Sequence, residues 1–414
     1  MPNFQSYHPE QAGLLPAHVR DVLGADHLCF LLHEVVEGWD LSEFEAAYSD
    51  AGGQSPYDPR LMLKVWLYAF ALNVRTTRKL EQRVREDLGF RFLAGGAEPD
   101  HKTLSEFHRR HAQAIRRFFT QVLRLLRNSG LAQVGTVAID STRIKANASR
   151  HRMLREADLE RKVAEWQKHL DDDPDRTPGT RVGIESLDRV REQLQRVRES
   201  GEKRLSETDP EARFVRDGHG HFQLGYTAEI AVSEDHFIVA QRVTQAKNDN
   251  HALVPLVDAV AEECQQPPGC VLADAAFSSQ ANLQQMEARG IEAYIPDCNL
   301  ASEMRGNLCA DELLPARDPR LLAMRHKLRT PAGRKQYHRR QGLVEPVFGT
   351  LKEHRGLRQF QRRGLAKVAV EFTLAALSYN LVRLYRLRNT RLAPAHRDST
   401  SAASIQTVCP STHS

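Results

Sequence analysis

Apolar positions recur at helical spacing from residue 58 to about residue 128 and predict four consecutive helices. The first, near residues 61–72, is apolar on almost every side, as in a buried helix, whereas the second carries one stripe of Leu80, Val84 and Leu88. A third helix opens at His101 after a glycine pair, and the fourth, near 115–126, alternates apolar residues with arginines. The pattern predicts an all-helical domain over 57–130 after a loosely helical lead-in over 1–56, and it fits DNA binding and oligomerisation equally well.

After residue 130 the period changes, and the chain to residue 388 predicts an α/β domain. The second and third of its strands are separated by Ser233-Glu234-Asp235, which favours a hairpin. Helical patterns near 251–264 and 278–289 lie between the later strands, so a sheet with helical cover is expected. The five runs that predict strands are residues 134–139, 225–232, 236–243, 270–273 and 291–295.

An insertion over about 150–206 separates the first strand from the second. It contains two apolar stripes at helical spacing, one around Trp166 and one around Leu194, joined by the helix-breaking connector 171–180. We therefore expect a charged helical hairpin that protrudes from the sheet. The tail over 389–414 is rich in Ser, Thr, Ala and Pro and is expected to be disordered.

Composition excludes several classes of protein. The chain has 414 residues, 41% hydrophobic and 27% charged, which fits a globular protein with a substantial core. The longest apolar run, 61–74, is interrupted by Lys64 and is shorter than a membrane span, and no secretory signal is expected at the N-terminus. Six cysteines without a CxxC pair exclude a zinc finger or ribbon and favour free thiols in a reducing cytoplasm.

Positive charge is concentrated in one segment. Between Arg320 and Arg363 there are 13 Lys and Arg against only Glu345 and Glu353, so this segment carries +11 while the whole chain carries +5. Aromatic residues are interleaved with these cations, as in surfaces that bind polyanions, because each neutralised phosphate releases counterions. A solvated basic surface is the alternative interpretation.

Three acids are candidates for catalytic chemistry. Asp140 ends the first predicted strand, Asp274 ends the fourth, and Glu345 lies inside the basic segment. If the first and fourth strands are parallel neighbours, both aspartates project from the same carboxyl edge of the sheet. Carboxylates from separate elements suit Mg²⁺, although a single Asp at a strand end is more often a helix N-cap.

The segment around Glu345 predicts a helix that starts or breaks at 345–346. Lys352 lies seven residues after Glu345 and would share its face in an unbroken helix. Pro346 cannot donate to the carbonyl of Gly342, however, so a break or a new start is expected there.

At this point the residues resemble a known family. Asp58-Pro59-Arg60 and residues 99–107 are similar to the N-terminal domain of bacterial insertion-sequence transposases of the IS1182 and IS5/IS4-like groups. Other segments are similar to their catalytic DDE domain, most specifically residues 344–349, and the whole resemblance covers about residues 55–385. The matching segments of that domain are residues 137–145, 208–213, 225–226, 273–274 and 344–349.

The resemblance implies a ribonuclease-H-like fold in which Asp140, Asp274 and Glu345 hold two Mg²⁺ or Mn²⁺ ions. The Tyr–Arg–Glu–Lys signature of such enzymes falls on Tyr337, Arg340, Glu345 and Lys352, and together with Arg339 and Arg355 its basic and aromatic members are expected to contact DNA. The implied partners are the inverted repeats at the element ends, target DNA and a second copy of the chain in a synaptic homodimer, without a membrane and in the bacterial cytoplasm at the nucleoid.

Two alternatives remain open at the level of sequence. Ala275-Ala276-Phe277 follows Asp274 where the family usually continues with Gly and Tyr, which is compatible with a domesticated derivative that binds DNA without cleaving it. A metal-dependent nuclease without strand transfer shares every candidate ligand.

Overall fold

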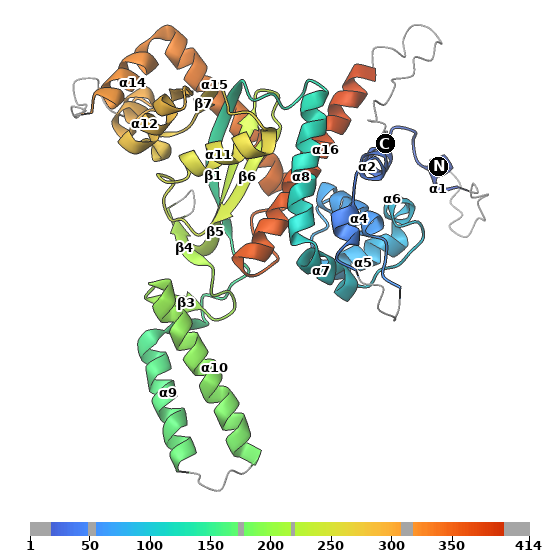
Figure 1. Ribbon diagram of the computed structural model, residues 1–414, viewed down its shortest axis with the longest axis vertical. Helices are drawn as coiled ribbons and strands as arrows, with labels where there is room; N and C mark the ends of the chain where they lie inside the picture. The colour runs from blue at the N-terminus through green and yellow to red at the C-terminus, as the bar shows by residue number, and fades with distance from the viewer. Residues whose placement is uncertain (1–17, 49–54, 173–177, 217–219, 308–317, 393–414) are drawn as a thin grey trace, which may run out of the picture. The chain divides into compact units, whose positions relative to one another are not determined.

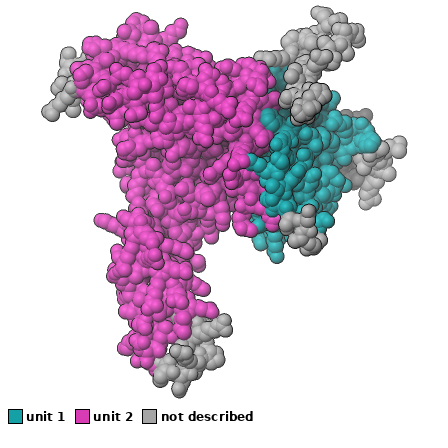
Figure 2. Space-filling view, viewed as in Figure 1, with its two compact units in different colours: residues 1–107, 381–414 teal, residues 108–380 magenta. Residues whose placement is uncertain are grey.

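The structure is a computed structural model that describes residues 18–48, 55–172, 178–216, 220–307 and 318–392. The chain folds as two compact units, residues 1–107 with 381–414 and residues 108–380 (Figure 2). The last 12 residues of the chain's longest described helix, α16 (Leu365–Leu392), belong to the first unit. Four residues of the expected disordered tail, 389–392, are therefore helical, and 393–414 lie outside the described residues.

The first unit is helical (Figure 1). Its central helix, α4, begins where Asp58 caps the free amides and Pro59 occupies the first position, with Asp58 Oδ1 accepting from Arg60 N at 2.7 Å. Trp66 and Phe70 of this helix are fully buried. The described helices of the unit are α1 (Val19–Val22), α2 (Leu28–Glu37), α3 (Ser42–Glu45), α4 (Pro59–Ala71), α5 (Thr77–Glu86), α6 (Leu88–Leu93) and α7 (His101–Arg110), which runs to the unit boundary.

The second predicted helix is two helices in the structure. The stripe of Leu80 and Val84 lies on α5, but Leu88 opens α6. The cause is Asp87, whose Oδ1 accepts from Gly89 N at 2.9 Å and from Phe90 N at 3.2 Å and so caps a new helix.

The second unit is built on a six-stranded mixed sheet in the order β4-β5-β1-β7-β8, with β6 also paired to β5. The expected hairpin is confirmed, because β5 and β6 run antiparallel across the turn at 234–237. The condition stated for the first and fourth predicted strands is met, because β1 and β7 are parallel neighbours. The strands are β1 (Thr136–Lys145), β4 (Arg213–Arg216), β5 (Phe222–Ser233), β6 (Ile238–Thr244), β7 (Cys270–Leu272) and β8 (Glu292–Tyr294).

Helices cover this sheet. The helix expected near 115–126 belongs to this unit by its packing on α11, where Thr120 Oγ1 donates to Glu263 and Arg127 Nη2 donates to Gln266 Oε1 at 2.6 Å. The first part of α16 is buried, and Asn380 bonds both the amide and the carbonyl of Ile238. The covering helices are α8 (Ala112–Asn128), α11 (Leu253–Cys264), α12 (Gln280–Ala288), α13 (Cys298–Met304), α14 (Pro319–Arg329) and α15 (Pro331–Gly349), followed by the π-helical turn η3 (Thr350–His354).

The insertion forms the expected helical hairpin, α9 (Glu156–Asp171) and α10 (Pro178–Ser200), which projects from the sheet (Figure 1). At its base, β2 (Met153–Arg155) pairs antiparallel with β3 (Arg204–Ser206). The hairpin has an apolar cluster of its own, with Val163 and Trp166 packed against it. The cluster consists of Leu154, Leu159, Val190, Leu194, Val197 and Leu205.

One described helix, Leu365–Thr390 within α16, is long and apolar enough by composition to cross a membrane. Since 78% of that window is buried inside the protein, it has the character of a core helix. Of the cysteines in the described ranges, Cys29, Cys264 and Cys270 are buried free thiols and Cys298 is an exposed one.

Candidate active site

Sheet topology brings two of the three candidate acids together. In the parallel ladder of β1 and β7, Ala138 is paired with Leu272. Asp140 and Asp274 each lie two residues further along, so both stand at the same edge of the sheet. The local sequence supports this, because the residues before each aspartate are buried and apolar.

The two carboxyl groups interact electrostatically. Burial raises the pKa of Asp140 to about 6, a shift that Arg340 opposes and the nearby Asp274 carboxylate increases. Burial likewise raises the pKa of Asp274. Positive charge placed nearby would therefore stabilise the ionised forms of these two desolvated carboxyl groups.

Arg340 of α15 supplies part of that charge. Its Nη1 lies 3.0 Å from Asp140 Oδ2, and the two side chains are only 11% and 18% exposed. One turn earlier on α15, the half-buried Tyr337 shares a hydrogen bond with Arg340, and burial raises the pKa of Tyr337. The helix with the Tyr–Arg signature is thus attached directly to the strand that carries Asp140.

Lys352 belongs to the same group of side chains. It is half-buried in η3, and burial lowers the pKa of its ammonium group, as does Arg358, while the Asp140 carboxylate acts in the opposite direction. Asp140 therefore lies within the electrostatic reach of two cations, Arg340 and Lys352.

The expected break at 345–346 is wrong, because α15 continues through Pro346 to Gly349. Gly342 and Pro346 are both exposed, so water can reach the carbonyl that Pro346 leaves without a donor. The irregularity falls instead in η3, where Arg355 N bonds Thr350 O at 3.0 Å.

The start of α15 is closely packed. Thr330 caps it and Pro331 takes its first position, while a Cβ on Gly333 would lie 2.0 Å from the carbonyl oxygen of Lys327. Only glycine fits this corner between α14 and α15, which fixes where α15 begins.

Glu345 lies apart from the two aspartates. Its side chain is exposed on α15 and has no hydrogen bond or ion pair among the described residues. Within the described ranges, no three His, Cys, Asp or Glu side chains form a group that could hold a metal ion. The structure thus brings together Asp140, Asp274, Tyr337, Arg340 and Lys352, and it leaves Glu345 free at the surface of the same helix.

The donor set still fits a divalent cation. Asp140 and Asp274 offer hard carboxylate oxygens, which Mg²⁺ and Mn²⁺ prefer. Their raised pKa values show that the charged forms are undercompensated, and the buried Arg340 Nε has no hydrogen-bond partner. A cation at this edge would relieve the repulsion between the carboxylates.

The basic segment 320–363 has fewer cations available for DNA contact than its net charge suggests. Seven of its 13 cations form ion pairs, including Arg339 with Glu234 at 2.5 Å. Arg355 is 3% exposed and its Nη1 donates to Ser378 Oγ at 3.1 Å, so the expectation that it contacts DNA is corrected to a structural role. The other ion pairs are Arg320–Glu287, Arg325–Asp297, Lys327–Glu292, Arg329–Glu303, Arg340–Asp140 and Arg358–Glu353.

Arg143 and Asp249 form a partly buried ion pair that no pattern in the sequence indicated. Arg143 Nη2 donates to Asp249 Oδ2 at 3.0 Å and to the Lys247 carbonyl at 3.2 Å, and its Nη1 donates to Ser141 Oγ at 2.7 Å. The Asp249 carboxylate raises the pKa of Asp274 further, after burial, and Arg143 lowers it. The only sequence signal was the loop 248–251, which suggested a helix cap.

The turn after Asp274 tolerates its alanines. Residues 275–277 form a short 3₁₀ turn (η1), capped by Asp274 Oδ1, which accepts from Ala276 N at 2.9 Å. Neither alanine has a positive φ, so glycine is not required there, and Phe277 is fully buried. The departure from the Gly–Tyr pattern therefore fits the local backbone.

Two further motif segments have a structural role. The buried Tyr226 hydroxyl donates to Asp209 at 2.8 Å, and Gly364 N bonds the same carboxylate at 3.1 Å. These contacts join β5 to the segment before α16.

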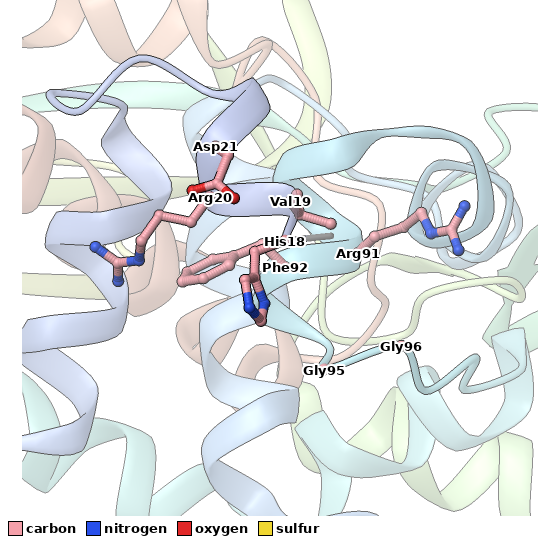
Figure 3. A pocket seen from close by; sticks show the side chains of 8 residues that line it. All are labelled: His18, Val19, Arg20, Asp21, Arg91, Phe92, Gly95 and Gly96. Atoms are coloured by element: carbon pink, nitrogen blue, oxygen red, sulfur yellow. The ribbon is translucent and has the colours of Figure 1, made fainter. Parts of the chain in front are cut away.

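The first unit has an open pocket of about 450 Å³, shown in Figure 3. Arg20 and Arg91 point away from each other, and Asp21 lies between them in the lining (Figure 3). Arg20 instead packs over the Phe30 ring at 4.4 Å. The lining does not converge on a ligand.

Comparison with known proteins gives two family matches. Residues 18–110 match the family described as Transposase domain (DUF772), and residues 311–385 match Transposase DDE domain. The second match spans Tyr337, Arg340, Glu345 and Lys352, whereas Asp140 and Asp274 lie outside both matches. No curated protein and no solved structure matches the chain.

Proposed function

Because the chain belongs to the DDE transposases of insertion sequences, we propose that it binds the ends of its own element, cleaves them with a divalent metal and transfers the strands to target DNA. The observation that carries this proposal is the parallel pairing of β1 with β7, which brings Asp140 and Asp274 to one edge beside Arg340. This is a polynucleotidyl transferase with a ribonuclease-H-like catalytic sheet.

Asp140 and Asp274 hold the metal in this proposal, with Glu345 as the third ligand from α15. Two Mg²⁺ or Mn²⁺ ions, when bound, supply Lewis acidity that activates an attacking water or 3′-hydroxyl and stabilises the leaving oxygen. Both aspartates must be ionised to act as ligands, and Arg340 helps to keep Asp140 ionised by lowering its pKa.

The remaining polar residues orient DNA. The planar guanidinium of Arg340 can hold a phosphate by two parallel hydrogen bonds, and Lys352 acts as a point charge nearby. Tyr337 fixes Arg340 through their hydrogen bond. Arg339 forms an ion pair with Glu234, and its side chain is 41% exposed. It contacts DNA at the edge of the site when this ion pair breaks.

The first unit contains most of the match to the transposase domain over residues 18–110, and it binds the inverted repeats. Synapsis of two ends needs at least two copies of the chain, so a homodimer on DNA is part of the proposal. The site of action is the bacterial cytoplasm at the nucleoid.

A nicking assay tests the function. Full-length protein is incubated with a duplex carrying the element end, with MgCl₂, MnCl₂ or EDTA, and strand breaks at the end are measured. Asp140→Asn, Asp274→Asn and Glu345→Gln are each expected to lose at least 100-fold in rate. The matched control is Asp172→Asn, an exposed aspartate at the tip of the hairpin.

Joined products separate the possible outcomes. Metal-dependent nicking with strand joining supports a transposase, whereas nicking without joining supports a nuclease. Binding of the end without any nicking, in wild type and variants alike, contradicts the catalytic proposal and supports a DNA-binding derivative. Loss of nicking in Glu345→Gln at unchanged DNA affinity assigns that residue to the metal site.

A further inference from the structure

A strip of alternating arginines and phenylalanines lies at the base of the helical hairpin. It consists of Arg155 of β2, Arg204 of β3, Phe214 and Arg216 of β4 and Phe222 of β5. Arg155 is paired directly with Arg204, and Arg216 directly with Phe222, so each pair shares one face of its ladder.

Cation–π contacts connect the two ladders. The Arg204 guanidinium lies 4.6 Å from the centre of the Phe214 ring, and that of Arg216 lies 5.0 Å from the centre of the Phe222 ring. The Phe222 side chain is nevertheless 56% exposed, the most exposed of the large hydrophobic residues described. Arg150 Nη2 donates to the Phe222 carbonyl and fixes the start of β5.

Among the described residues, no acidic side chain forms an ion pair with the arginines of the strip. Arg155, Arg204 and Arg216 are exposed and take part in no ion pair within the described ranges. Two like charges directly opposite each other in a ladder repel, as Arg155 and Arg204 do. In the segment 320–363, by contrast, seven of the 13 cations form ion pairs with acids of this protein.

Phe222 of the strip and Asp140 lie on one face of the six-stranded sheet. Asp140 is opposite Ile230, and alternate residues of β5 share a face, so Phe222 is on the face of Asp140. Eight residues separate 222 from 230, which is about 27 Å along the strand at about 3.4 Å per residue.

We propose that this strip, Arg155–Arg204–Phe214–Arg216–Phe222, is a binding site for a DNA strand with unpaired bases. The three arginines contact consecutive phosphates, and Phe222 stacks on one base. Exposed aromatic rings among unpaired cations suit single strands, since the bases of a duplex are already stacked and cannot reach a ring. This rests on the proposed function, in which cleavage frees strands at the element end.

Binding is measured with the cleavage-inactive Asp140→Asn protein in EDTA, by fluorescence anisotropy of a labelled 20-nucleotide single strand and of the same sequence as duplex. Arg155→Gln, Arg204→Gln and Arg216→Gln are combined in one variant. The control combines Arg189→Gln, Arg191→Gln and Arg196→Gln, exposed arginines on α10 with the same total charge change. Phe222→Ala is compared with Phe222→Trp.

We expect the strip variant to bind the single strand at least tenfold more weakly. The magnitude of the slope of log K against log salt should decrease by about 2, because each of the three lost phosphate contacts contributes about 0.7. Phe222→Ala should lose about fivefold or more, and Phe222→Trp should retain affinity because its ring still stacks. The α10 control should keep both affinity and slope.

Equal loss in the control, an unchanged salt slope in the strip variant, or a loss on duplex as large as on the single strand would overturn the proposal. Thermal melting by circular dichroism verifies that each variant is folded. Since this assay uses no metal and no cleavage, its failure is independent of the nicking assay: strand binding without nicking refutes only the proposed function, and nicking without strand binding refutes only the strip.

Discussion

Replacing Asp140 by Asn should change how the stability of the metal-free protein depends on pH. Burial raises the pKa of Asp140 from 3.8 to about 6, which corresponds to about 3 kcal/mol at 1.36 kcal/mol per unit. The side chain is only 18% exposed, so solvent screening removes little of this. An acid whose pKa is raised by folding stabilises the native state fully below its unfolded pKa, and that contribution is lost as the pH rises through about 6.

The wild type should therefore lose about 2.5 kcal/mol relative to Asp140→Asn between pH 4 and pH 7.5, because a small part of the change has already occurred at pH 4. The ion pair with Arg340 forms only where Asp140 is ionised, and its effect is already included in the pKa of about 6, so the pH-dependent difference remains. The assay is urea unfolding followed by circular dichroism in EDTA at several pH values, with Asp172→Asn as the exposed control. A difference between the variants that stays constant within about 1 kcal/mol across this range would show that the carboxyl group is well solvated.

Metal gives a second readout on the same pair of proteins. At pH 7.5, Mg²⁺ at 100 times its dissociation constant should stabilise the wild type by about 2.7 kcal/mol, because it binds only the native state. Asp140→Asn should gain much less. Equal stabilisation of both proteins would locate the metal elsewhere.

Three further changes test the surrounding structure. In calorimetric titration, Arg143→Gln should raise Mn²⁺ affinity by about tenfold and Asp249→Asn should lower it by about as much, because the two charges oppose each other near Asp274. The double variant should then have nearly the wild-type affinity. Effects of the same sign in the two single variants would indicate a purely structural pair. Tyr226→Phe should cost about 1–3 kcal/mol in urea unfolding, since the buried carboxylate loses its hydroxyl donor, and an unchanged midpoint would contradict this. Gly333→Ala should destabilise the protein by about 1–3 kcal/mol and slow nicking, because the added methyl group would clash with the Lys327 carbonyl. Full activity and stability would show that the backbone between α14 and α15 can move to accommodate the methyl group.

Local patterns in the sequence predicted much of the fold. The hairpin of β5 and β6 and the helical insertion follow from periodicity and turn residues that lie close together in the chain. The parallel pairing of β7 with β1 joins distant segments, and the sequence supplied only the two strands and the condition that they be neighbours. The positions of Asp140 and Asp274 at one edge follow from that topology.

Features that depend on contacts between distant segments were not predictable. Asp249 is 106 residues from Arg143, and Glu234 is 105 residues from Arg339, so neither ion pair leaves a local pattern. For the same reason a run of positive charge indicated a DNA surface, although six of its 13 cations form ion pairs with acids from distant parts of the chain. Pro346 was interpreted as a break, because whether water can reach the Gly342 carbonyl depends on packing that the sequence does not display.

The hairpin of α9 and α10 carries its own apolar cluster, and this gives it unusual evolutionary freedom. Because its stabilising contacts are made within the arm, whole turns can be added to or removed from both helices while the six strands keep their register. An appendage of this kind can lengthen, shorten or diverge in sequence without any compensating change near Asp140, so the reach of the arm can be selected separately from the chemistry.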